Sequence, residues 1–439
     1  MENPVIFLVE DFEDNTPIPL ITKKFPNLRD GRGYLEEIPR MLSSQPPTHI
    51  LFVKVKDFIK SANTSTFPYH RKIYYFISAY HVLATFTIFN LSLIDKEVID
   101  FLVKYRISII IDASIEETNI KDNAHYIFDR SMDLLSGKIL SWRGILNLPI
   151  YLINGGYKKT YRQLSHLPNI HHKHFHGSFF HCTYPGTKNY NQALENREQL
   201  FKQIDSKIVT DNTLLWQAFC REPRLSRILF QLNANHSDLK NIGEYSRLIP
   251  CGNFYKSQHK DLNLSSIGIE LDPDDIIELD KIQTISNEPT INEENIKKNL
   301  GLFHSNSLIH IVLETCSLHS LTDIQHQPTQ LTEKTSTAIL SGMPFIPLGG
   351  QFVAPLELLG FHSYFMLDWP SNENFLDSLS YVSDLLLKLS KLSTSQKNEL
   401  YNTWKETIKY NFDNFFKINI QEMYLTFLKL ENSFIRIPE

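Results

Sequence analysis

The sequence predicts an α/β protein built from two domains, each with a parallel sheet. Short apolar runs rich in β-branched residues alternate with stretches whose apolar residues recur at helical spacing, which is typical of doubly wound sheets. Residues 309–313 form the clearest run, as expected of a strand buried on both faces. The length of 439 residues exceeds one ordinary core, so two domains are expected.

The composition indicates a folded, soluble protein. Hydrophobic residues make up 42% of the chain and charged residues 21%, which excludes a disordered chain. The formal charge of −5 gives no basic footprint, so nucleic acid is not favoured as a partner. The four cysteines lack CxxC spacing, which favours free thiols in a reducing compartment.

No targeting signal and no membrane span are predicted. The N-terminus is acidic and lacks the basic n-region of a signal peptide. Residues 74–94 carry no Lys, Arg, Asp or Glu and are long enough to span a bilayer. However, His81, Asn90 and several hydroxyl residues interrupt this stretch, which divides well into a helix and a strand. We therefore expect a cytoplasmic protein.

The N-terminal domain, residues 1–205, is expected to hold one of the sheets. Strands are predicted at residues 5–9, 49–55, 85–91, 107–111 and 149–153, and helices at residues 71–83, 95–105 and 125–135. Each predicted strand is a short apolar run, whereas the predicted helices show apolar residues three and four positions apart. A polar stretch with a helical pattern, residues 189–207, leads to the second domain.

The second domain, residues 206–372, repeats this alternation. Helices are predicted at residues 211–221, 333–341 and 354–359, and strands at residues 228–232, 309–313, 345–348 and 364–367. Residues 257–299 are polar and acidic and are expected to form a surface insertion. Their acidic run, residues 272–275, lacks the glycine and terminal glutamate of a calcium loop, so we expect a solvated loop there.

Residues 373–439 follow the second domain and are predicted to be helical. Leucine and aromatic residues at helical spacing predict amphipathic helices at residues 374–392 and 396–416. Ser393 stands where it can cap the second helix. Such apolar stripes are typical of helices packed on a core.

The clearest chemical signal follows the strand at residues 309–313. Thr332 is a good N-cap for a helix that begins at Glu333, and Gly342 ends that helix. In a parallel sheet, the loops after the strands and the helix N-termini that they lead to face the ligand crevice. A helix N-terminus attracts anions, because its first N–H groups are unpaired and the macrodipole is positive there.

Charged side chains at this helix start suit a nucleotide sugar. Lys334 supplies positive charge for phosphate groups, and Glu314 or Glu333 can accept hydrogen bonds from ribose or sugar hydroxyls. The sequence therefore predicts a nucleotide-sugar site at the start of this helix.

An ordered set of short motifs carries a resemblance to a known family. The set is Ile-Val-Leu-Glu-Thr at residues 311–315, Leu-Thr-Glu-Lys-Thr at 331–335, Pro-Phe at 344–345 and Leu-Glu-Leu-Leu-Gly-Phe at 356–361. It resembles the donor-binding segment of GT-B glycosyltransferases of the α1,3-fucosyltransferase type. It is more similar to uncharacterised glycosyltransferase-like proteins of large phages and viruses. The similarity covers under half of the chain, from about residue 226 to about residue 416.

The resemblance implies two Rossmann-like domains that face a cleft, a GT-B-like arrangement, with C-terminal helices crossing back to the first domain. It implies transfer of a sugar from a GDP- or UDP-sugar to a glycan, protein or modified nucleobase. No cofactor and no metal are expected, since the chain lacks an Asp-x-Asp motif beside an apolar strand. If the protein is viral, the expected compartment is the host cytoplasm.

The donor-binding residues implied by the resemblance lie in two places. The first is the motif segment, with Glu314, Thr332, Glu333, Lys334 and Thr335. The second follows the strand predicted at residues 228–232 and holds Asn233 and Asn235. The phage and virus proteins usually have a basic residue at this second place. The departure leaves two interpretations open, a different donor or a purely structural strand.

The candidate general bases are Asp112 and Glu116, which follow the strand predicted at residues 107–111. Inverting sugar transfer needs a group that takes the proton of the acceptor hydroxyl, and a carboxylate at the carboxyl end of a strand is suitable. The alternative is that both residues cap the next helix and face water.

A histidine cluster follows, with His166, His171, His172, His174, His176 and His181. In an extended segment, His174 and His176 place both rings on one side, and imidazole is a good metal ligand. No carboxylate or cysteine completes a known metal spacing. A polar loop is the main interpretation. Acceptor-side contact by His174 and His176 and metal binding by the cluster are the functional alternatives.

Two other functions stay open beside the glycosyltransferase. One is a catalytically silent binding protein on the same fold, which the missing basic residue near Asn233 favours and the intact Thr332-Glu333-Lys334 opposes. The other is a phage-type enzyme that glycosylates DNA bases, which the net charge of −5 disfavours.

Overall fold

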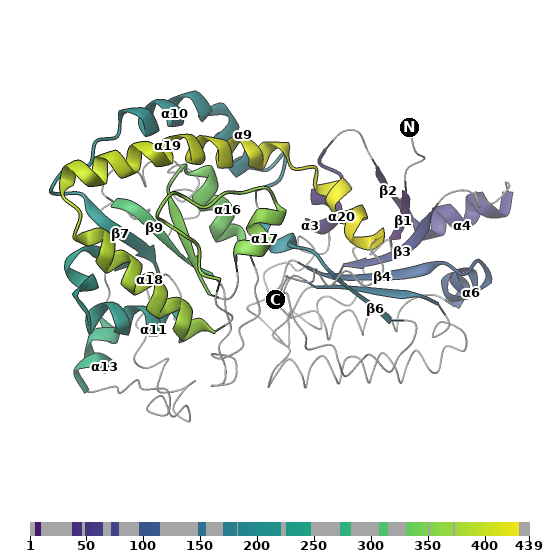
Figure 1. Ribbon diagram of the computed structural model, residues 1–439. Coiled ribbons are helices and arrows are strands. Elements are labelled where there is room, and N and C mark those ends of the chain that lie inside the picture. Colours follow the sequence, from purple (N-terminus) through teal and green to yellow (C-terminus); the bar gives the residue numbers. More distant parts are fainter. Residues whose placement is uncertain are drawn as a thin grey trace. The chain divides into compact units, whose positions relative to one another are not determined.

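The computed structural model describes residues 5–9, 37–45, 49–64, 72–78, 96–114, 148–154, 170–181, 183–220, 225–246, 273–281, 307–314, 331–349, 352–371 and 374–429. The chain forms two compact units. Unit 1 comprises Met1–His181 and Asn419–Glu439, and unit 2 comprises Cys182–Ile418. Each unit holds its own parallel sheet with helices beside it, so the predicted α/β class is confirmed (Figure 1).

The limits of the units differ from the predicted domain boundaries after residues 205 and 372. The helical stretch before residue 206 and the two long helices after residue 373 belong to unit 2. Only the segment that begins at Asn419 returns to unit 1.

The sheet of unit 1 is parallel throughout and has the order β2-β1-β3-β4-β5-β6. Its strands are β1 (Val5–Val9), β2 (Ile50–Lys54), β3 (Ile73–Ser78), β4 (Ser108–Ala113), β5 (Ile150–Asn154) and β6 (Ile170–His174). The described helices of this unit are α3 (Glu37–Leu42), α4 (Val55–Thr64), α6 (Lys96–Lys104), α8 (Gly177–Phe180) and α20 (Ile420–Lys429). The first strand lies between the second and the third, as in doubly wound sheets with a topological switch point.

The two faces of β4 meet different helices. Ile109 and Ile111 join the hydrophobic core that α4 and α6 form with the sheet. Because side chains alternate along a strand, Ile110 and Asp112 point to the opposite face. On that face the hydroxyl of Tyr424 in α20 donates to Asp112, so α20 packs against this side of the sheet.

The sheet of unit 2 is also parallel and has the order β10-β9-β7-β8. Its strands are β7 (Leu214–Phe219), β8 (Gly243–Ser246), β9 (Ser307–Leu313) and β10 (Phe345–Leu348). Its described helices are α9 (Lys188–Glu195), α10 (Arg197–Ser206), α11 (Leu225–Asn235), η4 (Asp238–Asn241), α13 (Pro273–Asp280), α16 (Glu333–Leu340), α17 (Val353–Leu358), α18 (Phe375–Ser390) and α19 (Thr394–Lys417). Its first strand again lies between its second and third, which repeats the topology of unit 1.

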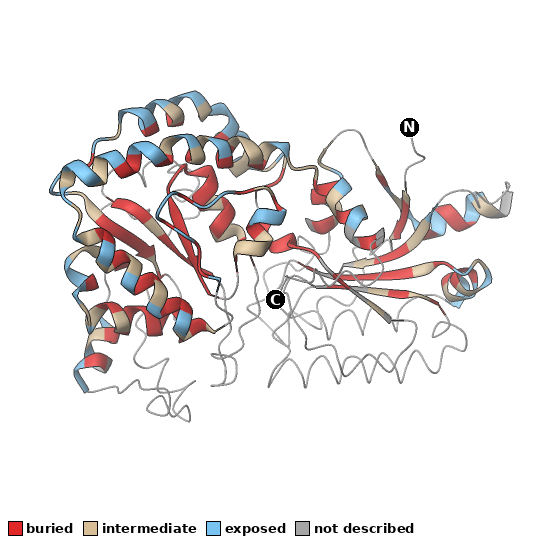
Figure 2. Ribbon diagram, viewed as in Figure 1, coloured by how far each residue is buried: buried red, intermediate tan, exposed pale blue. Residues whose placement is uncertain are grey.

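Helices cover both faces of the sheet in unit 2. Figure 1 shows α16 and α19 on one side of the sheet and α11 and α18 on the other. Figure 2 shows that the strands are buried and that α19 has one buried and one exposed side along its length. Ser393 caps α19 in a capping box with Gln396, as the sequence predicts for Ser393.

Three predicted elements that fall on described residues are wrong in type. A helix is predicted at residues 71–83, but the described part of that range, residues 72–78, holds β3, a central strand between β1 and β4. Residues 211–221 hold β7 in place of a helix, and residues 228–232 lie in α11 in place of a strand. Both β7 and α11 are buried on nearly every side. Their sequences therefore lack the alternation of apolar and polar residues that distinguishes the two-residue period of a strand from the 3.6-residue period of a helix.

Two smaller predictions also need correction. Residues 364–367 form a tight turn closed by one isolated bridge, and Met366 takes a φ of 59° in place of strand geometry. The acidic run at residues 272–275 belongs partly to α13, where Asp275 is buried and bonded to His236.

Some predictions lie outside the described residues. These are the strand at residues 85–91, the helix at residues 125–135 and most of the acidic insertion. Within the described ranges, no helix is both long enough and apolar enough to cross a bilayer.

Candidate functional site

The best candidate for a functional site is the carboxyl end of the sheet in unit 2. Ligands of open α/β sheets bind where the strand order reverses, outside the carboxyl ends of the strands. The reversal in unit 2 lies between β7 and β9, which are paired in parallel. Glu314 follows β9 directly and therefore stands at this switch point.

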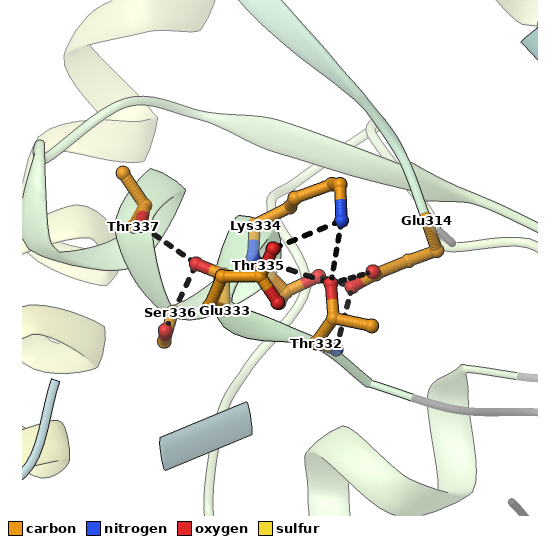
Figure 3. Close-up of polar contacts among 7 residues, drawn as sticks. All are labelled: Glu314, Thr332, Glu333, Lys334, Thr335, Ser336 and Thr337. Atoms are coloured by element: carbon orange, nitrogen blue, oxygen red, sulfur yellow. Dashed lines mark hydrogen bonds and ion pairs between the residues drawn. The ribbon is translucent and has the colours of Figure 1, made fainter. Parts of the chain in front are cut away.

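The start of α16 is tied to Glu314 by several hydrogen bonds (Figure 3). The N–H of Thr332 donates to Oε1 of Glu314 at 3.1 Å, and the Thr332 hydroxyl donates to Oε2. The hydroxyl of Thr335 donates to Oε1. Thr332 is the N-cap of α16, as the sequence predicts, because its Oγ1 accepts from the N–H of Lys334 at 3.3 Å.

Glu314 is a fully buried acid. Its exposed fraction is 0%, and this burial raises the pKa of Glu314 above its ordinary value. The charge of Lys334 and the hydrogen bonds from Thr332 and Thr335 lower the same pKa but do not outweigh burial. The Glu314 carboxylate is thus held by protein donors and has no surface to offer a ligand.

Lys334 is the cation of the site. Its Nζ lies 3.0 Å from Oε1 of Glu333 and 3.3 Å from Oγ1 of Thr332. The side chain of Lys334 is 28% exposed and that of Glu333 is 41% exposed, so both can meet a ligand from solvent. Figure 3 shows the Lys334 ammonium above the helix start, near the Glu314 and Thr332 side chains.

Further hydroxyls fix the first turn of α16. Ser336 and Thr337 both donate to the carbonyl of Glu333, at 3.0 and 2.6 Å. The hydroxyls of Ser336 and Thr183 lie 3.1 Å apart, which joins the turn to the segment before α9. Gly342, with a φ of +64°, ends the helix as predicted.

Asn233 and Asn235 are not part of this cluster. They lie at the C-terminal end of α11, and in a βαβ unit that end leads to the amino edge of the sheet, opposite Glu314. Asn233 Nδ2 donates to the hydroxyl of Ser383 at 2.8 Å, and Asn235 Oδ1 accepts from the hydroxyl of Tyr245 at 3.0 Å. The donor role depended on a strand at residues 228–232, and this described segment is helical.

Asp112 lies in unit 1 near the carboxyl end of β4, as predicted, but it is buried with an exposed fraction of 0%. The hydroxyl of Tyr424 donates to its Oδ2 at 2.5 Å, and the N–H of Ser114 donates to its Oδ1 at 2.8 Å. Burial raises the pKa of Asp112 despite these bonds. Glu116 lies outside the described residues.

The histidine cluster is partly a strand and not only a polar loop. The backbone of β6 ends at His174, and His176 is buried directly before α8. His166 and the side chains of His172 and His174 lie outside the described residues. In the described ranges, no three His, Cys, Asp or Glu side chains are grouped so as to hold a metal ion.

Sequence reasoning missed Tyr424, the partner of Asp112. The two residues are separated by 312 positions, and no local pattern relates them. It also missed the pair formed by Asp275 and His236, 39 positions apart.

The comparisons with known proteins assign no family. No protein-family model matches this chain, and no curated protein is significantly similar to it.

Proposed function

We propose that the protein is a glycosyltransferase that moves a sugar from a nucleoside-diphosphate donor to a hydroxyl acceptor. One observation carries the proposal. A capped helix start with a partly exposed lysine stands at the switch point of a parallel sheet. This is where such sheets bind nucleotides, and the motif resemblance to GT-B enzymes agrees with it.

The chemistry proposed for unit 2 is electrostatic. Lys334, which now pairs with the Glu333 carboxylate, would pair with a phosphate oxygen of the donor. The diphosphate carries more negative charge than the carboxylate. The positive end of the α16 macrodipole adds to this attraction. Together they would stabilise the diphosphate as it leaves the sugar, and stabilisation of developing charge is usually the main source of rate enhancement in such a transfer. Glu333, once Lys334 has turned to the phosphate, can accept from a sugar or ribose hydroxyl.

The resemblance assigns the acceptor side to unit 1. There Glu116 is the favoured candidate for the base that takes the proton of the acceptor hydroxyl, because Asp112, the other candidate, is buried and held by Tyr424 and Ser114. His174 and His176 are the candidates for acceptor contact. The acceptor itself, whether glycan, protein or nucleobase, is left to the experiment.

The test is binding of nucleoside diphosphates and their sugars, measured by thermal shift and by titration calorimetry. A ligand at one hundred times its Kd stabilises a fold by about 2.7 kcal/mol, which is readily detected. Lys334→Ala should abolish the shift and leave the unliganded fold intact. If no nucleotide shifts the protein, or if Lys334→Ala binds as the wild type does, the proposed donor site is wrong.

The chain offers a matched control in Lys188→Ala. Like α16, α9 has eight residues and a threonine N-cap, Thr187, and Lys188 is an exposed lysine in its first turn. Lys188→Ala should leave nucleotide binding unchanged. Turnover with a bound donor then separates the transferase from a silent binding protein.

A further inference from the structure

We infer that Glu314 is a positioning residue of the proposed donor site, which sets the direction of Lys334 through the hydroxyl of Thr332. The inference rests on the proposed function for its ligand. It changes the role of Glu314 from a ligand contact to a group that acts behind the ligand-binding surface.

The Glu314 carboxylate is buried behind the start of α16. Its exposed fraction is 0%, and both of its oxygens accept from the helix start of α16. A ribose hydroxyl would have to displace Thr332 or Thr335 to reach it. Since those bonds hold the N-cap itself, such displacement would unwind the surface that binds the ligand. Glu314 therefore acts through its protein partners.

Glu314 sets the direction of the Thr332 hydroxyl. A hydroxyl has one donor hydrogen and two acceptor lone pairs. The hydrogen of Thr332 goes to Oε2 of Glu314, so both lone pairs are turned toward other donors. One accepts from the N–H of Lys334 and the other from Nζ of Lys334, each at 3.3 Å. The carboxylate thus fixes an acceptor that holds Lys334 by both its backbone and its ammonium.

A carboxylate satisfies this network and the amide of glutamine does not. Glutamine has the same shape but places an NH₂ at one of the two oxygen positions. At the Oε2 position the NH₂ would face Thr332 Oγ1, which already receives two donors and would lose its acceptor. At the Oε1 position the NH₂ would face the N–H of Thr332 and the hydroxyl of Thr335. Neither orientation of Glu314→Gln satisfies the network.

The experiment is calorimetry of the best nucleoside diphosphate from the panel, at a temperature where every variant is folded by circular dichroism. Glu314→Gln and Thr332→Val should each weaken binding by about tenfold, as expected for loss of one well-placed charged contact. Thr332→Ser keeps the hydroxyl and should bind within about twofold of the wild type. Thr187→Val, the matched cap of α9, should leave the affinity unchanged.

A double-mutant cycle separates positioning from general loosening. In a Lys334→Arg background, which keeps weak binding through a differently shaped cation, Glu314→Gln should have less than half of its effect on the logarithm of Kd. Equal effects in both backgrounds, or wild-type affinity in Glu314→Gln, would overturn the inference.

Amide hydrogen exchange of residues 331–340 gives a readout that needs no ligand. Glu314→Gln and Thr332→Val should raise exchange in this segment to a similar extent, and Thr332→Ser should not. If the wild type binds no nucleotide, the proposed function fails, and this exchange pattern alone decides on Glu314. Unchanged exchange in Glu314→Gln would reject its positioning role.

Discussion

Replacing Tyr424 by phenylalanine removes one hydroxyl from a buried site in unit 1. That hydroxyl donates to Oδ2 of Asp112 at 2.5 Å, and the N–H of Ser114 donates to Oδ1 of the same carboxylate at 2.8 Å. Tyr424 is 1% exposed and Asp112 is 0% exposed, so water does not take the place of the hydroxyl. Loss of the hydroxyl leaves a buried acceptor without its partner, which costs about 1–3 kcal/mol. We expect Tyr424→Phe to lower the free energy of unfolding of unit 1 by about 2 kcal/mol near neutral pH.

The loss should depend on pH, and the sign follows from the pKa of Asp112. Burial raises that pKa, and the Tyr424 hydrogen bond partly lowers it. Because the folded pKa lies above the unfolded value, stability from Asp112 is present at low pH and is lost as the pH rises through the folded pKa. Tyr424 limits that loss by favouring the ionised form. Tyr424→Phe should therefore cost more near pH 7 than near the ordinary aspartate pKa of about 4.

The assay is hydrogen exchange of residues 108–113 together with urea unfolding followed by circular dichroism. Asp112→Asn is the control, since its amide can accept from Ser114 and donate to the oxygen of Tyr424 without burying a charge. It should be as stable as the wild type or more stable at pH 7. Equal stability of Tyr424→Phe and the wild type at pH 7, or a loss that grows toward pH 4, would refute the reasoning.

Two further predictions concern unit 2. Burial lowers the pKa of Lys207 to about 8, although its Nζ donates to the carbonyl of Ser307 at 2.5 Å. Between pH 8 and 10.5 the unfolded state therefore binds more protons than the folded state. The free energy of unfolding of the wild type should rise by about 2 kcal/mol relative to that of Lys207→Met between about pH 7.5 and 9.5. Parallel pH profiles of the two proteins in urea unfolding would contradict this. Gly243→Ala places a Cβ within 2.4 Å of three atoms of the buried Trp216 ring and should cost about 2 kcal/mol, measured by the shift in tryptophan fluorescence on unfolding.

The start of α16 could be predicted from the sequence because its signals are local. The threonine cap, the apolar run of β9 and the glycine at the C-terminal end each act within a few residues. The role of Glu314 could not be predicted, since it depends on which of its neighbours the fold places at its two oxygens. A carboxylate that lies before a helix start is equally suited to contact a ligand or to hold the first turn of the helix.

The two wrong predictions, a helix where β7 lies and a strand within α11, have a different cause. All residues of α11 except Asn233 and Asn235 are buried, and the middle of β7 is buried on both faces. Without a polar side, period alone does not distinguish a short buried strand from a buried helix. The apolar residues Leu225, Ile228 and Leu232 do recur at helical spacing, which was the available signal.

Glu314 and Asp112 are both buried carboxylates that hold other parts of the protein, and for Asp112 this burial speaks against a role as general base. Glu314 follows the third strand of one sheet and Asp112 lies in the fourth strand of the other, and each holds a segment distant in sequence. A general base must exchange protons with an acceptor hydroxyl, whereas Asp112 is fully buried and its oxygens already bind Tyr424 and Ser114. If the protein is a transferase, Asp112→Asn should therefore keep more than about one tenth of the turnover, because an acid–base group contributes about 100-fold or more. Glu116→Gln, compared at the same donor saturation, should lose more than Asp112→Asn does. A loss of about 100-fold or greater in Asp112→Asn at wild-type donor affinity would return Asp112 to the role of base and would require Tyr424 to release it during the reaction.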